Sequence, residues 1–181
     1  MAAKKVDYAR LRAFLTRLDA ALNRPGVLFL LGGSSLTWRG VKEYSIDIDV
    51  ALPEGEQDPA SLLDAIDVAG DFVEALVDVI RMGETLPLPD GYEERAELAE
   101  QFERLTVYHF DPYSIAITKL ARSESRDVVD VSNMLLAGLI ECGALRRHFE
   151  SALAGFRRGV SRSDKEDFKR KVEAFYHQHC E

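Results

Sequence analysis

The sequence has little cysteine, no long apolar run and few positive charges relative to its acids. Two cysteines, Cys142 and Cys180, are too few for a disulfide framework and fit a reducing cytoplasm. No run of about 18 apolar residues is present, and Met1 to Lys5 lacks a following apolar core of a signal peptide, so we expect no contact with a membrane. The net charge of −8 argues against broad binding of nucleic acid, but not against a local basic groove.

Hydrophobic residues make up 46% of the chain, which is enough for a substantial core. The length of 181 residues fits one domain, or one domain with a helical appendage. Apolar residues at three- and four-residue spacing predict helices over residues 6–23, 34–39, 60–69 (ended by Gly70), 111–121, 126–136, 139–156 and 164–177. Strands are predicted over residues 27–31, 46–50, 75–81 and 105–110, and the charged segment 93–101 is predicted as a short helix.

The most informative stretch covers residues 27–52, and its first part is an apolar run that ends in Gly32-Gly33-Ser34-Ser35. We interpret the run as a buried strand that ends in a turn which glycine makes easily. Backbone N–H groups in such a turn, where it leads into a helix, can hold a phosphate. These four residues are therefore candidates for binding the phosphates of a nucleotide.

The second part of this stretch is the alternating segment Ile46-Asp47-Ile48-Asp49-Val50. Side chains alternate faces along a strand, so the two carboxylates share one face while the three apolar side chains point into the core. Two neighbouring carboxylates repel each other, and a divalent cation relieves that repulsion. Mg²⁺ suits the site because it takes one or two carboxylates together with substrate phosphates.

A further acid, Asp78, lies inside the apolar segment Val77-Asp78-Val79-Ile80. A buried carboxylate without a partner is costly, so Asp78 requires one. If its strand lies beside the strand of Asp47 and Asp49, Asp78 supplies a third carboxylate to the same site. The alternative is that Asp78 lies at a strand end or pairs with Arg81.

Lys119 and Arg122 are three residues apart and share one face of the helix predicted after Asp111. A lysine as a point charge and an arginine as a fork of donors suit a triphosphate. The alternative is a salt-bridge cluster within the helices. Its members would be Lys119, Arg122, Glu124, Arg126 and Asp127.

Arginines gather in the C-terminal third although the chain as a whole is acidic. We interpret them as a solvated face, and a contact with RNA or with an acidic partner is the alternative. The residues concerned are Arg146, Arg147, Arg157, Arg158 and Arg162.

The glycine turn followed by Asp47-Ile48-Asp49, with an apolar strand on each side, resembles the DNA polymerase β-like nucleotidyltransferase superfamily. There a Gly-Ser or Gly-Gly turn precedes an Asp-x-Asp/Glu strand. A second set of motifs resembles small bacterial and archaeal nucleotidyltransferases related to AbiEii-type toxins. It consists of the run LPLPDGYEERAEL, a strand ending in Asp111-Pro112, a helix with Lys-Leu-Ala, and then Arg-Asp-x-x-Asp. The match covers residues 27–145.

This resemblance implies an α/β (α+β) fold with a polymerase β-like palm, in which helices flank a small mixed sheet. Residues 1–136 would form this nucleotidyltransferase-like domain, and residues 137–181 a helical extension packed on it. It also implies Mg²⁺-dependent transfer of a nucleotidyl group from an NTP to a hydroxyl, in a toxin–antitoxin or phage-defence setting. The sequence does not distinguish between an RNA, a protein and a small molecule as the acceptor. An oligomer is compatible with the sequence.

By this resemblance Gly33 and Ser34 hold phosphate, Asp47 and Asp49 hold the metal, and Lys119 contacts the nucleotide phosphates. Asp78 would help to activate the acceptor hydroxyl. Glu43 stands where relatives usually have an arginine, and this departure supports an alternative function. The chain would then be a catalytically inactive binding module of the same fold, such as an antitoxin.

Overall fold

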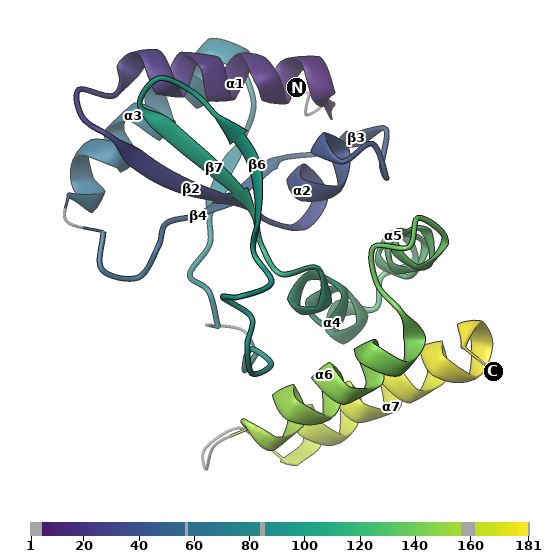
Figure 1. Ribbon diagram of the computed structural model, residues 1–181. Helices are drawn as coiled ribbons and strands as arrows, with labels where there is room; N and C mark the ends of the chain where they lie inside the picture. Colours follow the sequence, from purple (N-terminus) through teal and green to yellow (C-terminus); the bar gives the residue numbers. More distant parts are fainter. Residues whose placement is uncertain (1–4, 57, 84–85, 157–161, 181) are drawn as a thin grey trace. The chain divides into compact units, whose positions relative to one another are not determined.

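A computed structural model of the chain describes residues 5–56, 58–83, 86–156 and 162–180, with the side chains of 162–164 excepted (Figure 1). Contacts within the chain define two compact units. Unit 1 comprises Met1–Arg81 and Glu97–Phe110, and unit 2 comprises Met82–Ala96 and Asp111–Glu181. The predicted domain division between residues 136 and 137 stays a prediction, because contact-defined units need not coincide with functional domains.

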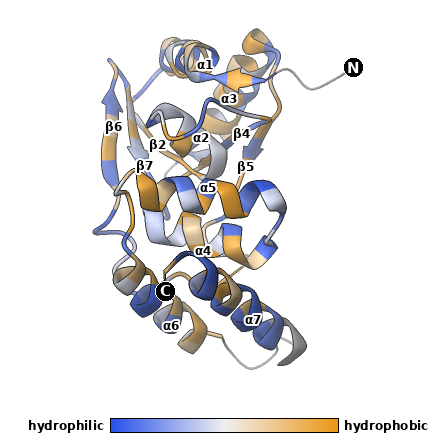
Figure 2. Cartoon of the chain, turned by 90° about the vertical axis from the view of Figure 1, so that its right-hand side faces the viewer, coloured by the Kyte–Doolittle hydropathy of each residue, from blue (hydrophilic) through white to orange (hydrophobic). Residues whose placement is uncertain are grey.

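Unit 1 is built on a five-stranded mixed sheet with the strand order β5-β4-β2-β7-β6 (Figure 1; β5 is labelled in Figure 2). Strand β2 pairs in parallel with β7 and antiparallel with β4, while β4 and β5 are parallel and β6 and β7 antiparallel. The predicted α/β fold with a small mixed sheet is thereby confirmed. The strands are β2 (Gly26–Leu30), β4 (Ile48–Ala51), β5 (Val77–Val79), β6 (Glu97–Gln101) and β7 (Leu105–His109).

Helices α1 (Tyr8–Ala21) and α3 (Pro59–Val73) supply the apolar stripes that complete the core of unit 1. Leu11, Leu15 and Leu18 recur on one face of α1 and are fully buried. Asp58 caps α3 by accepting a hydrogen bond from the backbone N–H of Ser61. A second, two-stranded sheet joins β1 (Val6–Asp7) to β3 (Tyr44–Ser45), and the short helix α2 (Gly32–Trp38) follows β2 directly.

Three local predictions for unit 1 are wrong. Segment 97–101 is the strand β6 and not a helix, because its pairing with β7 decides its conformation and a sheet edge tolerates charged residues. Helix α3 continues through Gly70, where a Cβ would lie 2.8 Å from Val77 Cγ2. Ile46 is 46% exposed and not part of the core, because β4 begins only at Ile48.

Unit 2 contains the helices α4 (Pro112–Arg122), α5 (Ser125–Leu136), α6 (Cys142–Ala154) and α7 (Arg162–His179). Hydrophilic and apolar residues alternate along α5 and α7, as expected for helices with one packed face (Figure 2). Asp111 caps α4, as predicted, by accepting hydrogen bonds from the N–H groups of Tyr113 and Ser114. Arg95 donates two hydrogen bonds to the same carboxylate and so holds the preceding segment against the start of α4.

The predicted basic patch is described only in part. Arg146 pairs with Glu173 and lies over the ring of Tyr176. Residues 157 and 158 and the side chain of residue 162 lie outside the described part of the chain. Among the residues that the structure describes, no helix is long and apolar enough to cross a membrane.

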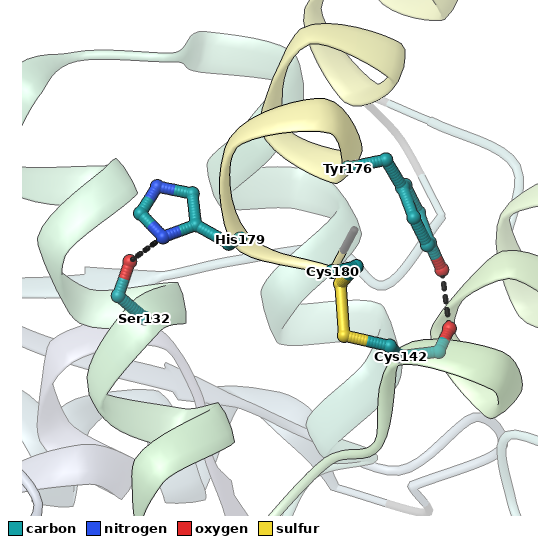
Figure 3. Close-up of a disulfide and its surroundings, with 5 residues drawn as sticks. All are labelled: Ser132, Cys142, Tyr176, His179 and Cys180. Atoms are coloured by element: carbon teal, nitrogen blue, oxygen red, sulfur yellow. Dashed lines mark hydrogen bonds between the residues drawn. A yellow bond between two sulfur atoms is a disulfide. The ribbon is translucent and has the colours of Figure 1, made fainter.

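Cys142 and Cys180 form a disulfide with Cα atoms 5.8 Å apart, whereas we interpreted them from the sequence as residues that fit a reducing compartment. The bridge joins the first residue of α6 to the residue after α7, and it forms because the two helices bring these ends together (Figure 3). The Tyr176 hydroxyl donates to the carbonyl of Cys142, and His179 faces Ser132 on α5 (Figure 3). The cytoplasmic location stays a prediction, although disulfides persist mainly in oxidising compartments.

Replacing Cys142 by serine is expected to lower the free energy of unfolding by about 2–4 kcal/mol, because the bridge restricts the unfolded chain. The closed loop has a sequence separation of 38 residues. Urea unfolding with and without dithiothreitol measures the effect. The reductant should bring the native chain to the stability of Cys142→Ser and leave the variant unchanged. Equal unfolding of the oxidised native chain and the variant would contradict the prediction.

Candidate functional site

Three acidic residues of unit 1 meet at one end of the sheet. Asp49 on β4 and Asp78 on β5 are direct partners in the parallel register, and Asp47 precedes β4 by one residue. One carboxylate oxygen of each residue lies within 4.8 Å of the others. The predicted proximity of Asp78 to the two other acids is therefore present in the structure, while its chemical role stays a prediction.

The alternation of β4 explains this arrangement. Ile48 and Val50 are fully buried and belong to the core of unit 1. The side chain of Asp49 consequently points to the opposite face, where it is only partly buried. Asp78 is exposed and lies in the middle of the short strand β5, so the alternative position at a strand end does not apply.

The glycine turn lies directly against these acids. Gly32 has a φ of +46°, in the left-handed region that favours glycine, and a Cβ there would collide with the Asp49 carboxylate. A Cβ on Gly33 would collide with the hydroxyl of Ser45. Gly33 N–H donates a hydrogen bond of 3.3 Å to Asp49 Oδ2. Both glycines are therefore needed for the backbone to approach the acidic strand this closely.

The hydroxyls of two serines hold the acidic segment in place. Ser34 Oγ accepts a hydrogen bond of 2.9 Å from the N–H of Asp49 and lies 3.5 Å from the carbonyl oxygen of Asp47. Ser45 Oγ lies 3.4 Å from Asp47 Oδ1. Ser34 is fully buried, so its hydroxyl serves the positioning of Asp49 in this structure. Its predicted role in phosphate binding stays a prediction.

Ser35 is also buried and contacts His109, which was not among the predicted site residues. Ser35 Oγ lies 3.0 Å from Nδ1 of His109, the last residue of β7. Burial, with a smaller contribution from the charge of Arg39, lowers the pKa of His109 to about 3. The buried face of β7 carries every second residue, namely Leu105, Val107 and His109. This alternation was the signal in the sequence that His109 is buried.

Because His109 is neutral when folded, the stability of unit 1 is expected to fall on acidification. The unfolded chain takes up this proton near the ordinary pKa of about 6.5, whereas the folded chain does so only near 3. Stability is therefore full above pH 6.5 and declines below it, by at most about 1.4 kcal/mol per pH unit from this group. Urea unfolding at pH 7, 6 and 5 should show a shallower decline for His109→Asn. Identical slopes would contradict the prediction.

Lys119 and Arg122 belong to unit 2, where they form part of a buried ion cluster between α4 and α5. Lys119 Nζ donates to Asp127 at 3.2 Å and to Asp130 at 2.7 Å, and Arg122 donates two hydrogen bonds to Asp127. Burial raises the pKa of Asp127, but the hydrogen bonds and charges of Arg122 and Lys119 outweigh this effect and leave the pKa below its ordinary value. The predicted cluster lay within the helices and did not include Asp130. The observed cluster includes Asp130 and joins α4 to α5.

The comparison with known families decides the assignment of the chain. A model of the family described as "Nucleotidyltransferase of unknown function (DUF6036)" matches residues 8–179. The chain belongs to this nucleotidyltransferase family. Neither the curated proteins nor the solved structures contain a significant match. The nucleotidyltransferase part of the predicted resemblance is thereby confirmed, whereas the relationship to AbiEii-type toxins is not.

Proposed function

We propose that the chain transfers a nucleotidyl group from an NTP to a hydroxyl acceptor with Mg²⁺. The observation that carries this proposal is the convergence of Asp47, Asp49 and Asp78 beside the glycine turn. Membership of a nucleotidyltransferase family supports the same reaction class. The proposed ligand set for Mg²⁺ is Asp47 and Asp49, with Asp78 as the third acid of the site.

The residues present fit a divalent cation. Three carboxylates with oxygens within 4.8 Å repel one another when ionised, and a hard cation with oxygen ligands balances that charge. Mg²⁺ keeps positions for water and substrate phosphates when it binds only one or two carboxylates. A bound Mg²⁺ would supply charge neutralisation on the triphosphate during transfer.

The proposed reaction is an in-line displacement at the α-phosphorus. The acceptor oxygen forms a bond to this phosphorus, the bond to the oxygen of the β-phosphate breaks, and pyrophosphate leaves. Asp78 accepts the proton of the acceptor hydroxyl, a role that suits the most exposed of the three acids. Asp49 is held by Gly33 and Ser34, which limits the movement of its carboxylate during the reaction.

The phosphates are proposed to lie along the turn formed by Gly32, Gly33, Ser34 and Ser35. By the family resemblance alone, Lys119 stays a proposed phosphate contact; in this structure its side chain is buried and pairs with two carboxylates. Its ammonium carries three N–H donors, and Asp127 and Asp130 account for two of them.

The proposed setting is a cytoplasmic toxin–antitoxin or phage-defence system, by the resemblance to AbiEii-type proteins. RNA ends, protein hydroxyls and small-molecule hydroxyls remain the candidate acceptors. Glu43, which is exposed where relatives carry an arginine, favours the alternative of an inactive binding module.

Label transfer tests the proposal. Each of the four NTPs is labelled either on the α-phosphate or on the γ-phosphate and incubated with Mg²⁺ and total RNA, lysate protein or a metabolite extract. We expect the α-label, and not the γ-label, to appear on one acceptor class, and Asp47→Asn to abolish the transfer. Nucleotide binding without any transfer would instead support the inactive binding module.

A further inference from the structure

We propose that His109 is a positioning residue for the acidic site, acting through Ser35 and the turn on the carboxylate of Asp49. This inference rests on the proposed function, because the hydrogen bond between His109 and Ser35 would serve the binding of a divalent cation. It adds a residue from β7, a strand that contributes none of the three acids.

Continuous contacts lead from His109 to Asp49. The imidazole Nδ1 lies 3.0 Å from Ser35 Oγ, and Ser35 N–H donates to the carbonyl of Leu31, so the start of α2 is fixed at two points. The neighbouring Ser34 accepts the N–H of Asp49 at 2.9 Å. Leu31 N–H donates to the carbonyl of Asp49 at 3.0 Å, which closes the connection between the turn and β4.

The surroundings of His109 keep its ring neutral and oriented. His109 is 5% exposed, and burial together with Arg39 lowers its pKa to about 3. A neutral imidazole with its hydrogen on Nε2 can accept a hydrogen bond from the Ser35 hydroxyl at Nδ1. Glu97, the cross-strand partner of His109, pairs with Arg39 at 2.8 Å, so the nearby cation is itself held in place.

The test compares the affinity for Mn²⁺, without nucleotide, in four single variants and in the double variant His109→Leu, Ser35→Ala. His109→Leu and Ser35→Ala remove the hydrogen bond, whereas His109→Asn keeps an acceptor close to the position of Nδ1. Thr37→Val is the matched control, because Thr37 lies buried in the same helix and its Oγ1 has no hydrogen-bond partner among the described residues. Titration followed by electron paramagnetic resonance, well below the melting temperature of each variant, measures the affinity.

We expect His109→Leu and Ser35→Ala each to weaken Mn²⁺ binding about threefold to tenfold, the range that one net hydrogen bond supports. The double variant should be no weaker than either single variant, and His109→Asn should bind within about twofold of the native chain. A loss of stability alone would not produce rescue by asparagine. Native Mn²⁺ affinity in His109→Leu would overturn the proposal.

A second measurement separates this proposal from the proposed function. Amide hydrogen exchange of Asp49, measured without metal, reports the hydrogen bond to Ser34 directly. Faster exchange in His109→Leu than in Thr37→Val is expected, and equal exchange would overturn the connection. If the native chain binds no Mn²⁺, the proposed function fails, and the exchange rates still decide whether His109 positions Asp49.

Discussion

Replacing Lys119 by alanine is expected to lower the free energy of unfolding of unit 2 by about 3–5 kcal/mol. Lys119 is 4% exposed, and its ammonium faces two carboxylates that are equally buried. Its removal takes away the cation that lies 2.7 Å from the buried Asp130 carboxylate, and Arg122 continues to contact Asp127. Breaking a buried ion pair on one side costs far more than losing an exposed pair.

Urea unfolding of three variants measures this effect. Arg122→Ala is the matched control, because it removes a cation of the same cluster whose side chain is 52% exposed, and it should cost only about 1 kcal/mol. The double variant Lys119→Met, Asp130→Leu removes both charges and should recover at least half of the loss. A loss below about 1 kcal/mol for Lys119→Ala would contradict the buried cluster.

The second large effect concerns the metal site: Asp47→Asn is expected to weaken Mg²⁺-dependent binding of NTP by about 100-fold or more, equivalent to about 2.7 kcal/mol. The variant loses one anionic ligand and keeps the shape of the side chain. Its stability without metal should be unchanged or higher, because the repulsion within the site of three acids is relieved.

Calorimetric titration with NTP and Mg²⁺, alongside thermal unfolding, tests both parts of this prediction. Asp67→Asn on the exposed face of α3 is the control, because it changes the net charge equally and lies outside the acidic site. Equal binding by Asp47→Asn and the native chain would remove Asp47 from the metal site.

The sequence predicted the parts of unit 1 that depend on local pattern. The alternation of Ile48, Asp49 and Val50 is read directly from neighbouring residues and occurs in the structure. Gly32 has the left-handed φ that the predicted turn requires, although Gly32 to Ser35 already belong to α2. The strand of Asp78 was also predicted, but its place beside β4 depends on the order of the strands in the sheet, so this position was only one of two alternatives.

Features that depend on distant segments were not predictable. Segment 97–101 is a strand only because β7 pairs with it, and Cys142 meets Cys180 only because α6 and α7 pack together. His109 and Ser35 are 74 residues apart in sequence and meet because β7 lies beside β2. The ion pair of Lys119 with Asp130 likewise forms because α4 packs against α5, and residue spacing within one helix does not predict such a contact.

We propose that Asp47, Asp49 and Asp78 form one site for a divalent cation and the phosphates of an NTP. The most direct test is a crystal structure of the native chain grown with Mn²⁺ and a non-hydrolysable NTP analogue, with anomalous diffraction recorded for manganese. We expect an anomalous peak about 2.1–2.2 Å from carboxylate oxygens of Asp47 and Asp49, with a phosphate oxygen as a further ligand and Asp78 beside it. A bound nucleotide whose phosphates lie elsewhere, with no manganese among the three acids, would contradict it.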